Sequence, residues 1–297
     1  MSATFWNVVT RCTTRALASG DLQPLETNET TIHAQGLPFT VRWAANLADK
    51  PRASNTAKPS LPGGPRDPDF NPFLNPDPEL TVGPLGEHHT AILNKFPVCL
   101  HHLVLARSEF AEQQTPLEYS DFEVLAMLLS NHGGVGFYNG GAAAGASQRH
   151  KHVQWIPHAS DNASLRPLLA GLPADLPAGD AARHPAFSFA HAFFRLAVHP
   201  GTAVSMQARS MLDAFETARH VLDLHPDDNG LLPAFNLITE NGWMLVVART
   251  QEHFHGASLN ALSFGGVVYV GDDAQRLALE QHGPLAALQA VSRPLNV

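Results

Sequence analysis

Two histidines and a glutamine occupy alternate positions near the middle of the chain. His150, His152 and Gln154 lie in a run from Gln148 to Trp155 that alternates along its length. Residues two apart on a β-strand point to one face, so a single strand face would carry two imidazoles and an amide. A neutral imidazole is a nucleophile near pH 7. The trio therefore favours covalent attack on an electrophile, or else zinc binding, since alternate histidines can chelate a metal.

A loop of small residues comes just before this run. From Tyr138 to Ser147 the sequence reads YNGGAAAGAS. Without bulky side chains, the backbone N–H groups of a loop can approach an anion closely. Such a loop, leading into a strand that presents two histidines, predicts a phosphate cradle with a nucleophile beside it.

The elements that must hold these residues follow from apolar spacing and turn signals. Helical spacing predicts an amphipathic helix near the N-terminus, with Phe5, Val8, Val9, Cys12 and Ala16 on one stripe. The same spacing predicts helices over residues 117–131 and 202–224, and short ones over 272–282 and 284–291. Short β-rich runs predict strands at 39–43, 88–96, 100–106, 135–138, 152–156, 187–196, 234–239 and 243–248, with Asn241-Gly242 as the last turn.

Composition narrows the class of protein. The chain has 297 residues, 44% of them apolar, which is enough to bury a sizeable core. A net charge of −8 disfavours a general nucleic-acid surface. The two cysteines, Cys12 and Cys99, are far apart and suit a reducing compartment. No apolar run is long enough to span a membrane, and the N-terminal helix is favoured over a transit peptide, so we expect a cytoplasmic protein.

The central residues resemble the signature of a known family. The segments Asn139–Gly141, Gly145–Gln148 and His150–Gln154 are similar to those of the diadenosine tetraphosphate phosphorylases, also called ATP adenylyltransferases. This family is a transferase branch of the histidine triad superfamily in which glutamine replaces the third histidine. Where the family has Asn-Ser-Gly, this chain has Gly140 in the middle position, so one hydroxyl of the family pattern is missing.

The resemblance extends over most of the chain and implies a fold. Further similar segments lie at 93–98, 101–105, 110–114, 234–239 and 258–266. The implied fold is α+β and histidine-triad-like, a mostly antiparallel sheet flanked by helices, in a single domain with long loops that covers residues 1–297. Its N-terminal part, residues 1–157, would carry the motif, and its C-terminal part, residues 187–297, would complete the sheet.

The resemblance also assigns roles to residues. His152 would be the nucleophile, with its other ring nitrogen held by an acceptor such as a backbone carbonyl, and Gln154 would donate to a phosphate oxygen. His150 would either orient His152 or pass a proton to the leaving group. The implied nucleotide and phosphate contacts are Lys50, Asn94, Lys95, Asn139, Gly145, Ala146, Ser147, Gln148, Asn236, Arg249 and Asn260. Phe73 would pack against a base or pin its loop to the core.

The implied reaction is phosphorolysis of diadenosine tetraphosphate by inorganic phosphate to ATP and ADP, through a covalent adenylyl-histidine. Mg²⁺ or Mn²⁺ would arrive with the nucleotide, and no protein-bound metal is expected. In related galactose-1-phosphate uridylyltransferases, histidines placed like His102 and His150 help to hold zinc, but the accompanying cysteines have no match here. The expected partners are small molecules, not nucleic acid or membrane, and the chain would be a monomer or a homodimer.

Other readings stay open at this stage. The enzyme could be a GDP-hexose phosphorylase or a hexose-1-phosphate uridylyltransferase of the same branch, although Lys151 stands where the uridylyltransferases have proline. A hydrolase would show no dependence on phosphate. A non-catalytic nucleotide sensor would bind dinucleotide without turnover.

Overall fold

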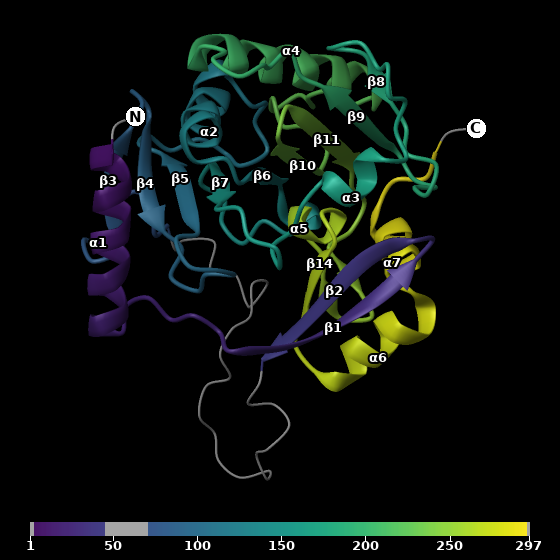
Figure 1. Cartoon of the computed structure of the whole chain (residues 1–297), viewed down its shortest axis with the longest axis horizontal. Helices are drawn as coiled ribbons and strands as arrows, with labels where there is room; N and C mark the ends of the chain where they lie inside the picture. Colours follow the sequence, from purple (N-terminus) through teal and green to yellow (C-terminus); the bar gives the residue numbers. More distant parts are fainter. Residues whose placement is uncertain (1–2, 45–70, 296–297) are drawn as a thin grey trace.

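The computed structural model describes residues 3–44 and 71–295 (Figure 1). Its centre is a nine-stranded sheet in the order β3-β4-β5-β7-β6-β10-β11-β9-β8, and every neighbouring pair is antiparallel. The strands are β3 (Thr81–Leu85), β4 (His89–Leu93), β5 (Leu103–Arg107), β6 (Val135–Gly140), β7 (His152–Ile156), β8 (Ala181–Ala182), β9 (His191–Arg195), β10 (Phe235–Glu240) and β11 (Trp243–Ala248). The predicted α+β class with a mostly antiparallel sheet is confirmed.

Two long helices cover one face of this sheet. They are α2 (Tyr119–His132) and α4 (Val204–Val221), which pack against each other as well as against the strands (Figure 1). The apolar residues that predicted them, including Phe122 and Phe215, are buried in one cluster with the apolar residues of the strands. A capping box of Glu118 and Asp121 starts α2, and Gly133, with φ of 64°, ends it.

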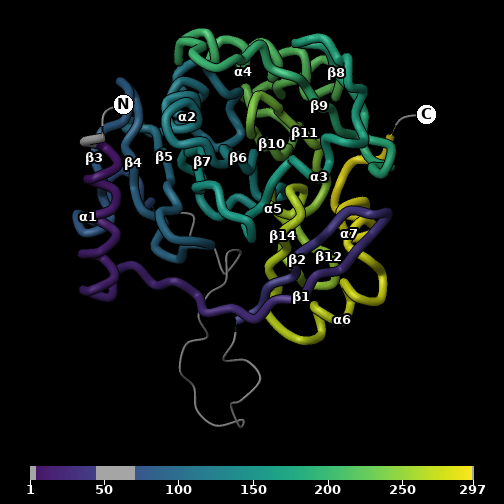
Figure 2. Tube along the Cα trace, viewed as in Figure 1, coloured from purple at the N-terminus to yellow at the C-terminus, as the bar shows by residue number. Residues whose placement is uncertain are grey.

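Residues 261–291, called the C-terminal segment below, cover part of the opposite face together with two strands from the N-terminal part of the chain. A three-stranded sheet of β1 (Thr27–Ala34), β2 (Leu37–Ala44) and β14 (Val267–Val270) lies there, with α5 (Ala261–Phe264), α6 (Asp273–His282) and α7 (Pro284–Val291). Strand β14 pairs parallel with β2, which joins segments from the two ends of the chain (Figure 2). These elements share a second buried cluster with β9, β10 and β11.

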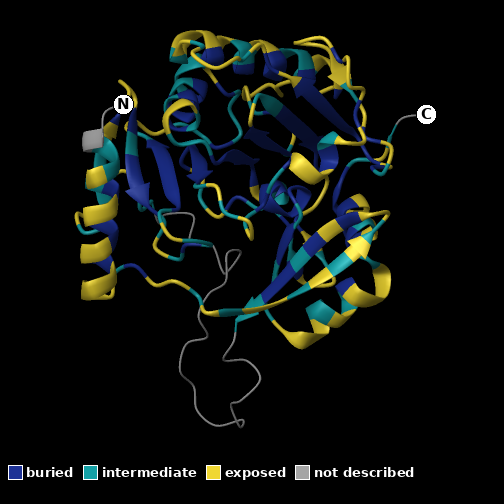
Figure 3. Ribbon diagram, in the orientation of Figure 1, coloured by how far each residue is buried: buried dark blue, intermediate teal, exposed yellow. Residues whose placement is uncertain are grey.

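The N-terminal helix α1 (Ala3–Ser19) packs at the β3 edge of the large sheet (Figure 1). Its buried stripe contains Val9, Cys12 and Ala16, and its other side faces solvent (Figure 3). The Cys12 thiol donates to the carbonyl of Glu79, which ties the helix to the loop before β3. The amphipathic helix that the sequence predicted is therefore an integral part of the fold.

The remaining elements are short. They are η2 (Ala142–Ala144), α3 (Arg166–Leu169), β12 (His253–Phe254) and β13 (Ala257–Ser258). Asn241 and Gly242 both have positive φ, 49° and 76°, and form the predicted two-residue turn between β10 and β11. Among the described residues, no helix has the length and apolar character that crossing a membrane requires.

Candidate active site

A cavity of about 690 Å³ opens on the same face of the large sheet as the C-terminal segment, over the strands that this segment leaves uncovered. Its floor is one row of residues in register across four strands, and the row consists of Ile92, Val104, Gln154 and Phe137. Because alternate residues of a strand share a face, each floor strand presents every second side chain to this space.

The cavity gathers most of the residues that the sequence had singled out. Ten of them line it, namely Asn94, Lys95, Asn139, Gly145, Ala146, Ser147, Gln148, His152, Gln154 and Asn260. His150, Asn236 and Arg249 do not line it, although they lie close behind it. Lys50 lies outside the described residues.

His152 reaches the cavity with one ring nitrogen already occupied. Its Nδ1 lies 2.8 Å from the carbonyl oxygen of His150, an acceptor, so Nδ1 carries the proton and Nε2 keeps its lone pair. Burial lowers the pKa of His152 to about 4, which holds the ring neutral at pH 7. The backbone acceptor expected for the second ring nitrogen is present, and the ring is set up as a nucleophile.

His150 departs from the expected geometry. The alternation from Gln148 to Trp155 predicted that His150 and His152 share one strand face. Strand β7 covers only the predicted 152–156, and His150 makes just an isolated bridge with Glu112. The ring of His150 is held by protein atoms: Nε2 lies 2.8 Å from the carbonyl of Arg107, and Nδ1 lies 3.0 Å from the amide oxygen of Asn71. The two histidines therefore do not present their rings side by side to the cavity.

Gln154 is held from behind by a histidine that the site prediction left out. The amide oxygen of Gln154 lies 2.9 Å from Nε2 of His102, which is buried and also lines the cavity. Burial lowers the pKa of His102 to about 4. The only sequence signal for His102 was its similarity to a zinc-binding position in related enzymes, which points to different chemistry.

The small-residue loop forms a tight turn beside His152. Gly141 and Gly145 have φ of 96° and 87°, and a Cβ on Gly145 would lie 2.9 Å from the Cβ of Asn260. The N–H groups of Gly141, Gly145 and Ala146 are bonded within the loop. In the described part of the chain, those of Ser147 and Gln148 have no acceptor. These two amides are therefore the groups of the loop that remain available to the predicted phosphate cradle, and the glycines allow the turn.

The ends of β6 and β7 are held apart by a buried glutamine. The side chain of Gln113 donates to the carbonyls of Asn139 and His152 at 2.9 and 3.2 Å, and its oxygen accepts from the His152 N–H at 2.8 Å. These are the backbone groups that would pair directly if the strands continued. Gln113 therefore keeps the backbone paired where the loop opens.

Asn236 and Arg249 act behind the cavity. Arg249 donates through Nη1 to the amide oxygen of Asn236, and through Nε to the carbonyl of Val291 at 3.0 Å. Asn236 donates to Asn139 at 2.8 Å and to the carbonyl of Ala144 at 2.9 Å. The two predicted binding residues thus connect the C-terminal segment to the small-residue loop.

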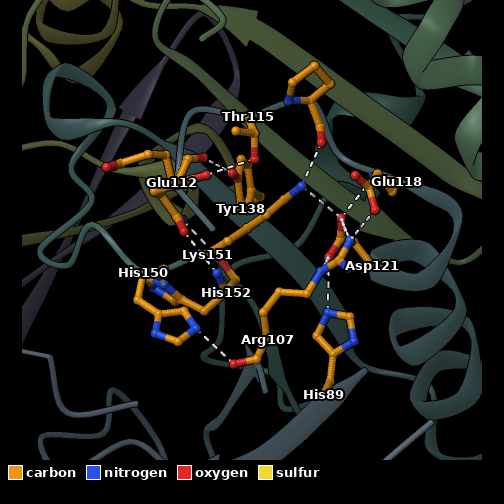
Figure 4. Close-up of polar contacts among 12 residues, drawn as sticks. His89, Arg107, Glu112, Thr115, Glu118, Asp121, Tyr138, His150, Lys151 and His152 are labelled. Carbon is orange, nitrogen blue, oxygen red and sulfur yellow. Dashed lines mark hydrogen bonds and ion pairs between the residues drawn. The ribbon is translucent and has the colours of Figure 1, made fainter. Parts of the chain in front are cut away.

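A buried charged cluster fixes the histidine segment from the opposite side (Figure 4). Asp121 accepts from His89 at 3.0 Å and from Arg107 at 2.8 Å, and it lies 3.2 Å from the ammonium of Lys151. Burial alone would raise the pKa of Asp121, but the hydrogen bond from His89 and the two cations hold it well below its usual range. Lys151, between the two histidines, therefore points away from the cavity.

Phe73 adds an aromatic wall to the cavity. The ring of Phe73 lies 4.9 Å from that of His152 and 5.9 Å from that of His150, centroid to centroid, and it lines the cavity. The Phe73 ring thus packs beside both histidines and borders the cavity. The apolar lining was otherwise not singled out, because Leu80, Ile92, Leu93, Val104 and Leu262 read as ordinary core residues in the sequence.

The polar rim combines capping residues with one cation. Asn260 caps α5 by accepting from Leu262 N–H at 3.0 Å, and Asn94 accepts from Phe96 N–H at 3.1 Å. Lys95 is exposed at the cavity wall.

Within residues 3–44 and 71–295, no three His, Cys, Asp or Glu side chains group as a metal site would require. Among those residues, Asp77 is the one carboxylate in the cavity lining.

Comparison with known families gives two matches along the chain. Residues 1–171 match the family model described as the Ap4A phosphorylase N-terminal domain. Residues 185–294 match the one described as the ATP adenylyltransferase C-terminal domain. The first match includes the histidine segment, and the second includes Asn236, Arg249 and Asn260.

Two curated yeast proteins are similar in sequence. The chain is 35% identical over 131 residues to diadenosine 5',5'''-P1,P4-tetraphosphate phosphorylase 2 of Saccharomyces cerevisiae, which covers 39% of this chain and 38% of that protein. It is 30% identical over 141 residues to protein APA1 of the same yeast, covering 43% and 41%. The chain thus matches under half the length of these relatives.

Solved structures share the fold over nearly the full length. Yeast Ap4A phosphorylase Apa2 aligns with a TM-score of 0.76 and 22% identity, covering 99% of this chain and 95% of that chain. The same yeast protein in complex with Ap4A aligns with a TM-score of 0.76 and 21% identity, covering 99% of both chains.

Proposed function

The chain belongs to the Ap4A phosphorylase family, and on that premise we propose that it splits diadenosine tetraphosphate with inorganic phosphate into ATP and ADP. The observation that carries this proposal is the His152 ring. It is neutral, its Nδ1 is held by a carbonyl, and its Nε2 faces a cavity large enough for a nucleotide.

In the first step, the lone pair of His152 Nε2 attacks the α-phosphorus of the dinucleotide. A P–N bond forms, the P–O bond to the remaining polyphosphate breaks, and ATP leaves. The ring becomes positively charged, and its Nδ1–H stabilises that charge by donating to the His150 carbonyl. His150 acts here through its backbone and is itself fixed by Arg107, which supports the orienting role over proton transfer.

In the second step, an oxygen of inorganic phosphate attacks the same phosphorus. The P–N bond breaks, ADP forms, and His152 returns to its neutral state. Charge on the phosphate oxygens would meet the amides of Ser147 and Gln148 and the side chain of Gln154, while Lys95 would neutralise part of the polyphosphate. Donors that are fixed before the reaction stabilise the developing charge without reorganising.

A divalent ion such as Mg²⁺ or Mn²⁺ would screen the polyphosphate and polarise its oxygens. Such ions are commonly bound through substrate phosphates with few protein ligands. The cavity offers a single carboxylate, Asp77, among the described residues, which fits an ion that arrives with the nucleotide.

A labelling experiment tests the proposal. The protein is incubated with diadenosine tetraphosphate that carries ³²P at both α-positions, without phosphate, and is then denatured. We expect label on the protein, its release as ADP when phosphate is added before denaturation, and no label on the H152A variant. Release as AMP without any phosphate dependence would instead show a hydrolase, and absence of label would refute the covalent step.

The control variant for this experiment is H101N. His101 has a positive φ of 63°, which asparagine tolerates, and its ring contacts Trp6 and Thr13, away from the cavity lining. It should be labelled like the unmodified protein.

A further inference from the structure

Two side-chain amides in the cavity, those of Gln154 and Asn139, have their oxygen atoms occupied by protein donors. The oxygen of Gln154 accepts from His102, and that of Asn139 accepts from Asn236 and from the N–H of Ala261. In the part of the chain that the structure describes, neither amide nitrogen has a protein partner, and both residues line the cavity. Both amides therefore turn their N–H groups to the cavity.

The direction of the first contact is fixed by a backbone group. The N–H of Val98 donates to Nδ1 of His102 at 3.4 Å, so that nitrogen has no proton. A neutral histidine then carries its proton on Nε2. That proton can only be donated to an acceptor, which selects the oxygen of Gln154 rather than its NH₂ group.

The direction of the second contact is fixed by a guanidinium. Arg249 has donors only, so the atom of Asn236 that faces it must be the oxygen. The NH₂ group of Asn236 then points to Asn139 and donates to its amide oxygen. The Ala261 N–H donates to the same oxygen, which confirms that this atom of Asn139 is the acceptor. Two separate chains of hydrogen bonds thus end at an amide N–H in the cavity. One starts at the N–H of Val98 and the other at the guanidinium of Arg249, groups that can only donate.

We propose that His102 and Asn236 are positioning residues, which hold Gln154 and Asn139 with their N–H groups toward the phosphates of the substrate. The proposal rests on the proposed function, since it requires a phosphate in the cavity. A free amide can rotate by 180° and present its oxygen, which would repel a phosphate oxygen. Fixing the amide removes that state before substrate binds.

A double-mutant cycle tests the first pair. We expect Q154A to lower kcat about 10²-fold, as for removal of one fixed donor at a developing charge, with little change in KM. H102F should lower kcat about 10-fold or more, and H102F/Q154A should be no worse than Q154A, because His102 acts through Gln154. H101N, the neighbouring variant outside the cavity, serves as the control.

The outcomes separate the two proposals. If Q154A lowers kcat while H102F is as active as the unmodified protein, His102 does not position Gln154, and the proposed function stands. If the two single losses multiply in the double variant, the positioning role is also overturned. If Q154A itself is fully active, the phosphate contact of the proposed function fails, and this inference fails with it.

The variant N236D tests the pair of Asn236 and Asn139 while keeping the hydrogen bond to Arg249. A carboxylate at position 236 keeps an acceptor for Arg249, but it turns a second oxygen toward Asn139, which must then rotate. We expect a melting temperature close to that of the unmodified protein and a kcat about 10-fold lower. Full activity of folded N236D would overturn the role of Asn236.

One measurement reads the proton position of His102 in the unmodified protein itself. In ¹⁵N-histidine-labelled protein at pH 7.5, the NMR signals of His102, identified by their loss in H102F, should show Nε2 protonated and Nδ1 bare. A proton on Nδ1 would overturn the proposed direction of the contact.

Discussion

One row of residues crosses the large sheet and is open at one end and buried at the other. In the N-terminal half it consists of Ile92, Val104 and Gln154 and forms the cavity floor. Beyond Phe137 it continues as Ile238, Leu245 and Phe193, which are buried against α5, β14 and α7. The two halves have the same backbone pairing, and they differ in whether the C-terminal segment covers them.

The connections of the two halves differ in the same way. Strands β10 and β11 are joined by the two-residue turn at Asn241 and Gly242, whereas β6 and β7 are joined by residues 141–151. The short turn only reverses the chain, while the long loop supplies the amides of Ser147 and Gln148 to the cavity. A half that lines the cavity and a half that is buried thus arise on one sheet from loop length and coverage.

Two histidines show what this difference means chemically. His152 and His191 are both buried, each has Nδ1 2.8 Å from the carbonyl two residues earlier, and burial lowers each pKa to about 4. Nε2 of His152 faces the cavity, but Nε2 of His191 accepts from the N–H of His184 at 2.7 Å. The same ring therefore keeps an Nε2 available for the proposed nucleophilic attack where it is uncovered, and uses Nε2 as a structural acceptor where it is covered.

Replacing each histidine by alanine should separate the two roles most strongly. H152A removes the nucleophile and should lower kcat roughly 10⁴-fold or more, with the fold retained. H191A leaves a buried N–H unpaired and a cavity, so it should lower the free energy of unfolding by about 2–4 kcal/mol, with kcat per folded molecule unchanged. Steady-state kinetics and urea unfolding measure both. Comparable kcat losses in the two variants would remove the distinction.

Changing the size of one row residue in each half should give the next largest effect. V104F fills the cavity floor and should raise KM for the dinucleotide about 10- to 100-fold, with little change in stability. L245A creates a void in the covered half and should cost about 2–5 kcal/mol of stability with KM unchanged. A large stability loss in V104F with normal KM would show that the floor is core rather than binding surface.

The pH dependence should differ between activity and stability. In the free protein, protonation of His152 blocks Nε2, so kcat/KM should stay on a plateau from pH 8 to 5 and fall near pH 4. His102, His152 and His191 all have folded pKa values of about 4 against an unfolded value near 6.5. Between these values only the unfolded chain takes up protons, so stability is lost as the pH falls from 6.5 to 4.

Urea unfolding at pH 7.5 and 5.0 measures this loss, and the H191A variant should lose less stability over the interval than the unmodified protein. The pH dependence of kcat/KM of H191A should match that of the unmodified protein. A kinetic midpoint near 6.5 would contradict the buried, neutral state of His152.

The smallest expected effects come from the two connections. A Cβ at Gly242 would make only ordinary van der Waals contact with Val198, at 3.9 Å. G242A should therefore cost only the strain of a positive φ, about 1 kcal/mol, with kcat unchanged. G145A has similar strain, but its Cβ also displaces Asn260, so we expect kcat about 10-fold lower. Thermal melts and kinetics of the two variants measure this, and equal kcat values would show that the loop tolerates displacement.

Much of the fold could be predicted because local signals were strong. The helices at 119–132 and 204–221 follow apolar spacing, and the β10–β11 hairpin follows Asn241-Gly242. The motif with His152 and Gln154 likewise carries its own periodicity. His150 was misplaced because strand alternation assumes continuous pairing, whereas the segment before His152 pairs with residues 111–113 instead of continuing β7.

What the sequence alone determined is the chemical inventory: a histidine-glutamine strand, a loop that permits positive φ, and the helices that flank them. The tertiary structure decided which groups face the cavity, because that depends on contacts between residues far apart in the chain. His102 meets Gln154 from 52 positions away, and Asn236 meets Asn139 from 97. No local pattern encodes such contacts, since hydrogen-bond direction is set only when the folded chain brings a donor opposite an acceptor.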